Sequence, residues 1–457
     1  MVLNLEYGCS VQTIMILIFN VVCLSDFMVG YVNRYSQSKD MGCLVSTAKA
    51  PGNNRSRPEK LGNVFVYVPG RRIPRQVDFS QPLSSCLPRK IVERLSDLRS
   101  RIVVMASQEA PLIAIIRRKS ATQDGGSTLA DLQQALEDYL PVLLGLVKDG
   151  SQLQHKVQFD WINQEDETMK TAISNAWYEV LSVFHLMAMV LLSMANFMLL
   201  PRTSIDGYPP TVCDENKRVS IDIFLKVAGY LDFAVQQLLP QFPTELRAQL
   251  PVDLSEGVLK ALCLQALGQA AEIQLGMAID STKATLAVKR RLACEMVKYW
   301  QQAQDNLTNL PITNGWGEKH HLFIKWKRLE AKAAAYYFHS LILDEVNTEK
   351  SHGLAAAALQ AASDYLKESK KVVEAFHACP PSSSNPPLWG TMKYLSEKIP
   401  KDASSKVQIN HVTQLYDRIG ETAPTLPDFA LALKPDDYQL PPVDGSWNED
   451  EINGEKP

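Results

Sequence analysis

The sequence lacks every short motif that would point directly to catalysis. Its 457 residues contain no GxxxxGK[ST], GxSxG, HExxH or GxGxxG pattern, so the usual signs of nucleotide binding, a nucleophilic serine or zinc proteolysis are missing. Lys and Arg number 47 against 50 Asp and Glu, and no basic stretch is interleaved with aromatic residues, which argues against a nucleic-acid partner. We expect a protein that is not an enzyme and needs no cofactor; an enzyme with a novel motif is the weakest alternative.

Cysteine is sparse and scattered. The eight cysteines form no CxxC motif, no Cys/His pair at zinc spacing and no dense framework. This pattern suits a reducing compartment, where a buried cysteine acts as a small hydrophobic residue. His320 and His321 come nearest to a metal pair, but neighbouring side chains on a helix point about 100° apart, so we predict surface histidines and no metal site. His185 is predicted to be a buried, hydrogen-bonded histidine of the core.

The first apolar run is too short for a comfortable membrane span, which takes about 20 residues. The run from Thr13 to Leu24 contains Asn20, and the residues before it include Glu6 but no Lys or Arg. A signal peptide requires positive charge there, so residues 1–40 resemble one only weakly. A secreted or membrane-inserted helical protein that uses this segment is the alternative to the interpretation developed below.

The second apolar stretch runs from Thr168 to Leu200 and carries helical periodicity. It predicts one long helix that is buried on nearly every face, rather than a membrane span. Its core stripe is spaced 4, 3, 4, 3 and 4 residues apart and consists of Ile173, Trp177, Val180, Phe184, Met187 and Leu191.

A start-like signal lies inside the chain at residues 41–46, MGCLVS. It matches M-G-x-x-x-[ST], which predicts myristoylation of Gly42 once translation begins at Met41, and the adjacent Cys43 is a natural palmitoylation site. Basic residues follow in the polar segment, and two such signals together anchor a protein stably to a membrane. Our hypothesis makes residues 1–40 an upstream extension of the gene model and residues 41–60 an acylated basic linker. If Met1 is the true start, Gly42 cannot be myristoylated.

After this linker the chain is predicted to be all-α, with two exceptions. The β-rich run Val64–Val68, followed by a Pro-Gly turn, predicts a short N-terminal β-hairpin. From Asp417 the chain becomes Pro-rich and aperiodic, which indicates an extended arm laid over the helices, with residues 441–457 as a disordered acidic tail. Between them, paired helical segments predict solenoid-like stacking, similar to tetratricopeptide repeats but without their consensus. These segments are 254–279 with 282–308, and 317–347 with 349–378. An acidic pair, Asp253 and Glu256, resembles a capping box at the start of the first of them.

Several motifs in order resemble those of the BRO domain family, the ALIX and BROX type of endosomal-sorting proteins. The segments that carry the resemblance are FDW at 159–161, WYEVLSVFHLMAMVLLSMA at 177–195, LKALCLQALGQAAEIQLGMA at 259–278, AKAAAYYFHSL at 331–341 and YDRI at 416–419. The resemblance covers residues 61–440 and implies an elongated, boomerang-shaped helical domain. A BRO domain by itself, beginning with MGC, is similar to the short plant members of the family.

The resemblance also implies a partner and a site. BRO domains bind the C-terminal amphipathic helix of ESCRT-III subunits on a concave apolar patch, by helix-in-groove recognition. The corresponding positions here are Gln274 or Leu275, then Val288 and Leu292. Independently of the family, an edge of the helix 282–308, offset from its core face, carries apolar residues at Val288, Leu292, Met296 and Tyr299.

Two features of this edge stay open at the level of sequence. The apolar edge either forms a partner patch or simply widens the core stripe, and Gln274 stands where the family favours an aromatic residue. Lys289, Arg290 and Arg291 either meet acidic residues of a partner or form a solvated basic face. The acylation signal, the lack of catalytic motifs and the family resemblance together predict a membrane-anchored, non-enzymatic adaptor. We expect it in the cytosol, at the cytoplasmic face of endosomal or plasma membranes.

Overall fold

The computed structural model describes residues 64–108, 124–148, 152–165, 170–199, 212–311, 316–381, 393–413 and 422–448. All of them belong to one compact unit, residues 58–457. The predictions for residues 1–63, including the acylation of Gly42 and Cys43, lie outside the described residues, as do the YDRI segment and the last nine residues of the acidic tail.

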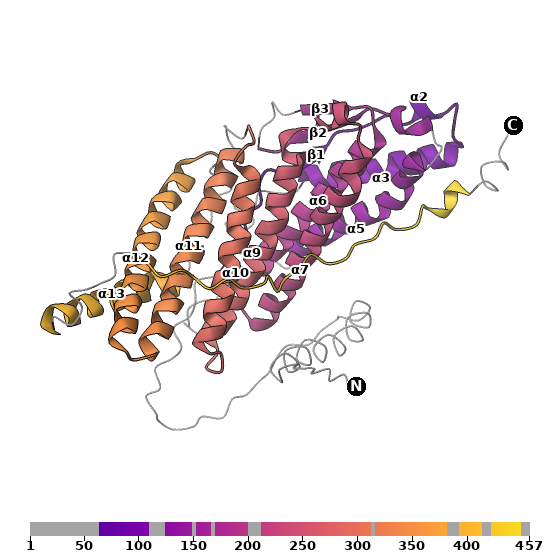
Figure 1. Cartoon of the computed structure of the whole chain (residues 1–457). Helices are drawn as coiled ribbons and strands as arrows, with labels where there is room; N and C mark the ends of the chain where they lie inside the picture. The colour runs from indigo at the N-terminus through magenta and orange to yellow at the C-terminus, as the bar shows by residue number, and fades with distance from the viewer. Residues whose placement is uncertain are drawn as a thin grey trace, which may run out of the picture. The chain divides into compact units, whose positions relative to one another are not determined.

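A row of long helices forms the body of this unit, as Figure 1 shows. Each helix packs mainly against its neighbours along the chain, which confirms the predicted all-α fold built from stacked helical hairpins. The long helices are α3 (Arg89–Gln108), α5 (Asp124–Leu144), α6 (Ala176–Met198), α7 (Asp214–Phe233), α9 (Glu256–Asp280), α10 (Leu286–Leu307), α11 (Trp316–Glu345), α12 (Glu349–Ala378) and α13 (Lys393–Thr413). Shorter elements are α2 (Ser80–Leu83), α8 (Thr244–Arg247) and single turns of other helix types at Gly145–Val147, Gln152–His155, Ala234–Leu238, Leu239–Gln241, Val252–Leu254 and Gly445–Trp447.

Helix α6 is the most deeply buried of the described helices. The Asn175 side chain caps its first turn by accepting from the backbone N–H of Trp177 at 2.8 Å, so the helix begins at Ala176 and not at Thr168 as predicted. Among the described residues α6 alone is long and apolar enough to cross a membrane, but 83% of its apolar window is buried inside the protein. Such burial is what the central helix of a helical domain requires, since it contacts other elements on every side.

A three-stranded antiparallel sheet sits beside α6. Its strands are β1 (Arg72–Pro74), β2 (Phe159–Asn163) and β3 (Lys170–Ile173), in that order across the sheet. The N-terminal segment therefore supplies one strand to a distant hairpin and does not form a local hairpin. Residues 64–68, the predicted β-rich run, pair instead with side chains of α9: Gln265 donates to the carbonyl oxygen of Tyr67 at 2.7 Å, and Gln269 to that of Phe65 at 2.8 Å.

The C-terminal arm, residues 422–448, is extended as predicted and crosses the helices, shown in yellow in Figure 1. Its backbone bonds to α7 through Asp436, whose N–H donates to Leu225 O at 3.2 Å. Tyr438 then packs edge-on against Phe184, with ring centroids 5.3 Å apart. The arm continues beyond residue 440 to Trp447, which is buried, so the boundary predicted for the tail at residue 441 is too early.

Candidate functional site

The predicted partner residues lie on the α9–α10 hairpin but differ in exposure. Thr285 caps α10 by accepting from the Val288 N–H at 3.3 Å, and one side of the first turns of α10 faces solvent. Val288 is 46% exposed, whereas Leu292 is partly buried against the core. Gln274 on α9 is also partly buried. We call these three residues, Gln274, Val288 and Leu292, the anchor surface.

The other two predicted residues belong to the core. Leu275 is fully buried and Met296 is 1% exposed, so neither offers area to a partner in this arrangement. The apolar edge of α10 therefore divides along its length. Its first two positions, Val288 and Leu292, reach the surface, and Met296 widens the core.

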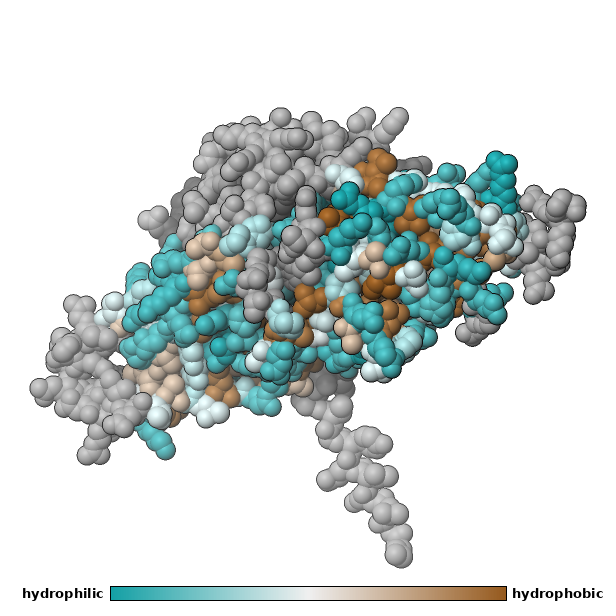
Figure 2. All heavy atoms as spheres, turned by 90° about the horizontal axis from the view of Figure 1, so that it is seen from above, coloured by the Kyte–Doolittle hydropathy of each residue, from teal (hydrophilic) through white to brown (hydrophobic). Residues whose placement is uncertain are grey.

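Elsewhere in the described ranges, large hydrophobic side chains are rarely exposed. Figure 2 shows a face on which hydrophobic residues reach the surface in several separate places among hydrophilic ones. The described large hydrophobic residues with marked exposure are Val104, Val288, Val346 and Val443. Val288 is the one among these four that lies on the α9–α10 hairpin, next to another apolar surface residue.

The basic residues beside the anchor surface are partly engaged within the chain. Arg291 donates through Nε to Glu295 Oε1 at 2.9 Å. Arg290 lies 3.2 Å from His339 Nδ1 and 6.0 Å from the centre of the Phe429 ring. Since a guanidinium only donates, His339 Nδ1 must be the acceptor. The side chain of Arg291 is still 46% exposed, so a positive charge remains accessible next to Val288.

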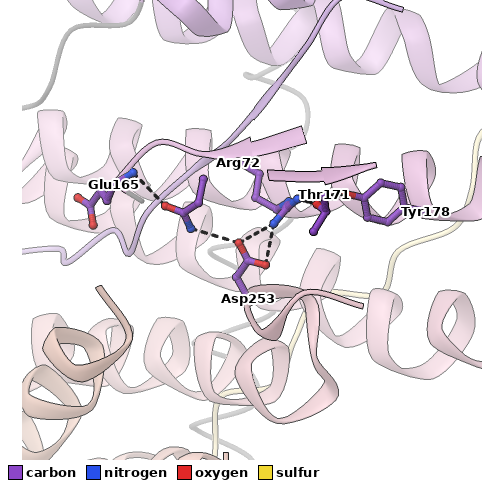
Figure 3. Close-up of polar contacts among 6 residues, drawn as sticks. Arg72, Glu165, Thr171, Tyr178 and Asp253 are labelled. Atoms are coloured by element: carbon purple, nitrogen blue, oxygen red, sulfur yellow. Dashed lines mark hydrogen bonds and ion pairs between the residues drawn. The ribbon is translucent and has the colours of Figure 1, made fainter. Parts of the chain in front are cut away.

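A buried polar network joins β1 to the start of α9, as shown in Figure 3. The guanidinium of Arg72 donates to both carboxylate oxygens of Asp253 at 2.9 Å, and also to the hydroxyl oxygen of Tyr178 at 3.0 Å. Burial disfavours the charge on Arg72, but Asp253 and Tyr178 outweigh it and raise its pKa. Asp253 thus pairs with Arg72 and does not cap α9, whose cap residue Ser255 makes no side-chain capping bond.

A second buried cluster links two of the motifs that suggested the family. The Trp161 indole N–H donates to Glu179 Oε2 at 2.6 Å, and the Tyr139 hydroxyl donates to Glu179 Oε1 at 3.2 Å. Arg99 forms an ion pair with the same carboxylate and lies 5.0 Å from the Trp161 ring centre. Burial lowers the pKa of Arg99 to about 10 and raises that of Tyr139 to about 12. All four side chains are sealed from solvent, so they stabilise the fold and cannot meet a substrate.

A third cluster joins α9 to α11. Lys327 Nζ donates to Glu272 Oε1 at 2.8 Å and to Glu330 Oε2 at 3.1 Å, and all three residues are buried. Burial raises the pKa of Glu272 against the opposing effect of Lys327. The pKa of Lys327 is raised despite burial, because two carboxylates stabilise its charge. Glu272 belongs to the α9 segment that carries the family resemblance, and its role is to tie two helices together.

The histidines in the described part of the chain form no metal site. His320 is fully buried, and its Nε2 lies 2.8 Å from Gln265 Oε1, so the prediction of a surface histidine was wrong at this position. Burial lowers the pKa of His320 to about 3 and that of His185 to about 4. His185 is buried as predicted, but its Nδ1 has no hydrogen-bond partner. Within the described residues no group of His, Cys, Asp and Glu is arranged to hold a metal ion.

Comparison with known proteins identifies the fold. The sequence-family model of the BRO1-like domain matches residues 65–422 of this chain. The chain belongs to the BRO1-like domain family. This confirms the family predicted from the FDW, WYEV and AEIQ segments. No curated protein matches the sequence.

Solved structures of BRO1 domains agree with this assignment. A crystal structure of ALIX in complex with the SIVmac239 PYKEVTEDL late domain matches with a TM-score of 0.55 and 18% identity, covering 84% of this chain and 50% of the ALIX chain. An ALIX BRO1–CHMP4C complex matches with a TM-score of 0.53 and 17% sequence identity. The match covers 84% of this chain and 98% of the chain in that structure. A structure described as the basis for endosomal targeting by the Bro1 domain matches with a TM-score of 0.53 and 15% sequence identity. The match covers 82% of this chain and 93% of the chain in that structure. The chain thus spans half of the ALIX chain in the first structure.

Proposed function

We propose that this protein is a non-enzymatic adaptor of endosomal sorting that binds the C-terminal amphipathic helix of an ESCRT-III subunit through the anchor surface. The observation that carries the proposal is the exposure of Val288 on a BRO1-like fold, at a position where the family resemblance places a partner contact. The similarity to a BRO1 domain solved with CHMP4C supports the choice of partner.

The geometry of α10 suits a helical ligand. Val288 and Leu292 are four residues apart and lie on one side of the helix, so they present two apolar contacts about 6 Å apart along its axis. An amphipathic helix places its own apolar residues at i, i+3, i+4 and i+7, which matches this spacing. The partly exposed guanidinium of Arg291 then lies beside the ligand and favours acidic residues on it, which increases association rate and specificity.

Gln274 is the residue that adapts this surface to a particular partner. An aromatic side chain at that position offers a large apolar face, whereas Gln offers a short amide that donates and accepts hydrogen bonds. We therefore propose a partner that presents a polar group opposite Gln274. Its affinity for this chain is lower than for a relative that carries an aromatic residue there.

Membrane anchoring completes the proposal. In a protein translated from Met41, a myristoyl chain on Gly42 and a palmitoyl chain on Cys43 hold the domain at the cytoplasmic face of endosomal or plasma membranes. We expect Gly42→Ala, expressed from Met41 in cells, to shift the protein from the membrane to the soluble fraction in a flotation experiment. An unchanged membrane fraction, or mature protein that retains residues 1–40, would remove this part of the proposal.

The binding proposal is tested by affinity. A fluorescent peptide with the C-terminal helix of CHMP4C is titrated with the full chain, and anisotropy gives Kd. Val288→Asp puts a charge into the apolar contact and is expected to weaken binding at least tenfold. Val104→Asp is the matched control, since Val104 is 52% exposed but lies on α3. Equal effects of the two variants, or none from Val288→Asp, would refute the proposed site.

A further inference from the structure

The outer face of α10 is a single stripe that is open in its first half and covered in its second. Val288, Leu292, Glu295 and Tyr299 follow one another at spacings of 4, 3 and 4, so they lie on one side of the helix. Val288 is exposed, whereas Glu295 is 2% exposed and Tyr299 is buried. The arm passes over this second half of the stripe, because its backbone bonds to both Glu295 and Tyr299.

The covering segment is the part of the arm from Asp428 to Leu433, which we call the latch. The Ala432 N–H donates to Glu295 Oε2 at 2.8 Å, and the Tyr299 hydroxyl donates to the Leu433 carbonyl oxygen at 2.8 Å. Lys298 forms an ion pair with Asp428 and donates to the Phe429 carbonyl oxygen. No latch residue is fully buried. Phe429, Leu431 and Leu433 are half-buried and pack against the core, so these apolar contacts and the polar contacts to α10 together hold the latch in place.

The arm beyond the latch is held much more firmly. Tyr438 is half-buried and packs against three aromatic rings. Trp447 is buried against Gly145, and its indole N–H donates to Val142 O at 3.0 Å. Segments with few buried apolar contacts open locally at lower cost than segments packed into a core. The end of the arm has the buried Trp447, whereas every latch residue is exposed or half-buried. The latch can therefore leave α10 while residues 436–447 stay in place.

The latch also limits how long a ligand on the stripe can be. From the first residue of α10, Leu286, to Glu295 the helix rises about 14 Å at 1.5 Å per residue. A helical ligand of two turns, about 11 Å, fits on this open length along the axis of α10. A ligand of four turns, about 22 Å, that lies along α10 from Leu286 extends over Glu295, where it meets the Ala432 backbone.

One carboxylate connects the two halves of the stripe. Glu295 accepts from Arg291 at 2.9 Å through one oxygen and from the Ala432 N–H at 2.8 Å through the other. Arg291 is also the accessible charge beside Val288. An acidic group on a ligand can pair with Arg291 and draw it away from Glu295. The buried Glu295 then loses its charged partner, which alters its remaining hydrogen bond with the Ala432 N–H of the latch.

We propose that the latch, Asp428–Leu433, is a displaceable segment that closes the second half of the α10 stripe, and that an acidic amphipathic helix of four or more turns must open it to bind. This inference rests on the proposed function, because it concerns the same ligand surface. It adds that a long helical ligand and the closed latch compete for the second half of the α10 stripe. Weakening the latch therefore increases the affinity for long helices and leaves the affinity for short ones unchanged.

The test uses two stapled, acidic amphipathic helices of nine and eighteen residues, which share one nine-residue sequence. Each is titrated by fluorescence anisotropy against the full chain and against the double variant Lys298→Ala, Tyr299→Phe. The variant removes three side-chain contacts to the latch while keeping the Tyr299 ring. We expect about tenfold tighter binding of the long helix to the variant, from the loss of competing hydrogen bonds, and unchanged binding of the short helix.

Hydrogen exchange provides a readout that needs no ligand. In the double variant the amide of Ala432 is expected to exchange about tenfold faster, while residues 436–447 exchange as before. Tyr337→Phe is the matched control, since its hydroxyl also makes a 2.8 Å bond, but to Asp402. It should leave latch exchange and both affinities unchanged.

The outcomes separate the two proposals. If Val288→Asp abolishes binding of both helices but the double variant binds the long one no better than wild type, the anchor surface stands and the latch is refuted. If neither helix binds to any variant, the proposed function fails, and the ligand role of the latch fails with it. Unchanged exchange at Ala432 in the double variant would show that these contacts do not hold the segment.

Discussion

Trp447 packs directly on Gly145, a contact between residues that are 302 positions apart in the chain. A Cβ placed on Gly145 would lie 1.9 Å from the Trp447 ring atom Cε2, so only glycine permits this approach. The contact fixes the far end of the arm against the turn that follows α5. This contact holds the end of the arm, whereas its earlier residues bond to α10 through polar groups and pack half-buried side chains such as Phe429 and Leu431 against the core.

Gly145→Ala is therefore expected to expel Trp447. Overpacking of this kind costs about 1–3 kcal/mol of unfolding free energy, measured by urea denaturation, and hydrogen exchange of residues 440–448 should accelerate. Gly445→Ala is the control, because its added Cβ would meet no heavy atom closer than 4.0 Å. If the two variants exchange alike, Gly145 does not anchor the arm.

The buried pair of Arg72 and Asp253 should be essential to stability. Asp253→Asn leaves the Arg72 charge buried without its counter-ion, which is expected to cost about 3–5 kcal/mol of unfolding free energy. Asp138→Asn, which breaks a half-exposed pair with Arg101, should cost at most about 1 kcal/mol. Chemical denaturation of both variants compares them, and equal costs would argue that the network in Figure 3 contributes little.

Stability should fall in mild acid because of the buried histidines. An unfolded histidine takes up a proton near pH 6.5, but burial holds the pKa of folded His320 at about 3. Between pH 6.5 and 4 the unfolded state thus binds more protons, and each such histidine lowers stability by up to about 1.4 kcal/mol per pH unit. His320→Gln should reduce this slope in denaturation curves. A slope that is unchanged in His320→Gln would contradict the assignment.

The anchor surface should respond to a gain of apolar area. Gln274→Phe supplies the aromatic residue that the family favours and is expected to increase affinity for the CHMP4C helix about tenfold, as an added aromatic contact can. Gln360→Phe, on the exposed side of α12, is the control for non-specific adhesion. A tighter complex with both variants, or with neither, would place the partner elsewhere.

The sequence predicts much of the fold because its strongest signals are local. The part of the predicted stripe from Trp177 to Leu191, spaced 3, 4, 3 and 4, identifies α6, although Ile173, its first predicted member, ends β3. The Pro-rich composition identifies the arm. Pairings between distant segments are missed. Val64–Val68 has the composition of a strand, but its backbone bonds to Gln265 and Gln269 of α9, which no local pattern reveals.

The prediction of the candidate site has similar limits. Helical spacing places Val288, Leu292 and Met296 on one edge of α10. The exposure of each side chain, however, depends on how the neighbouring helices and the arm pack against α10. The first two residues lie near the exposed start of the helix, and Met296 is covered. His320 shows the same limit, because its burial results from Tyr67 and Gln265, which approach it from other parts of the chain.

The central claim is that an ESCRT-III helix lies against Val288, and photo-crosslinking tests it most directly. The photoreactive residue p-benzoylphenylalanine replaces Val288 in one full-length variant and Val104 in another, and each is irradiated with the CHMP4C C-terminal peptide. The proposal predicts a cross-linked product with the residue at position 288 and none at 104. No product at 288, or equal yields at both positions, would contradict it.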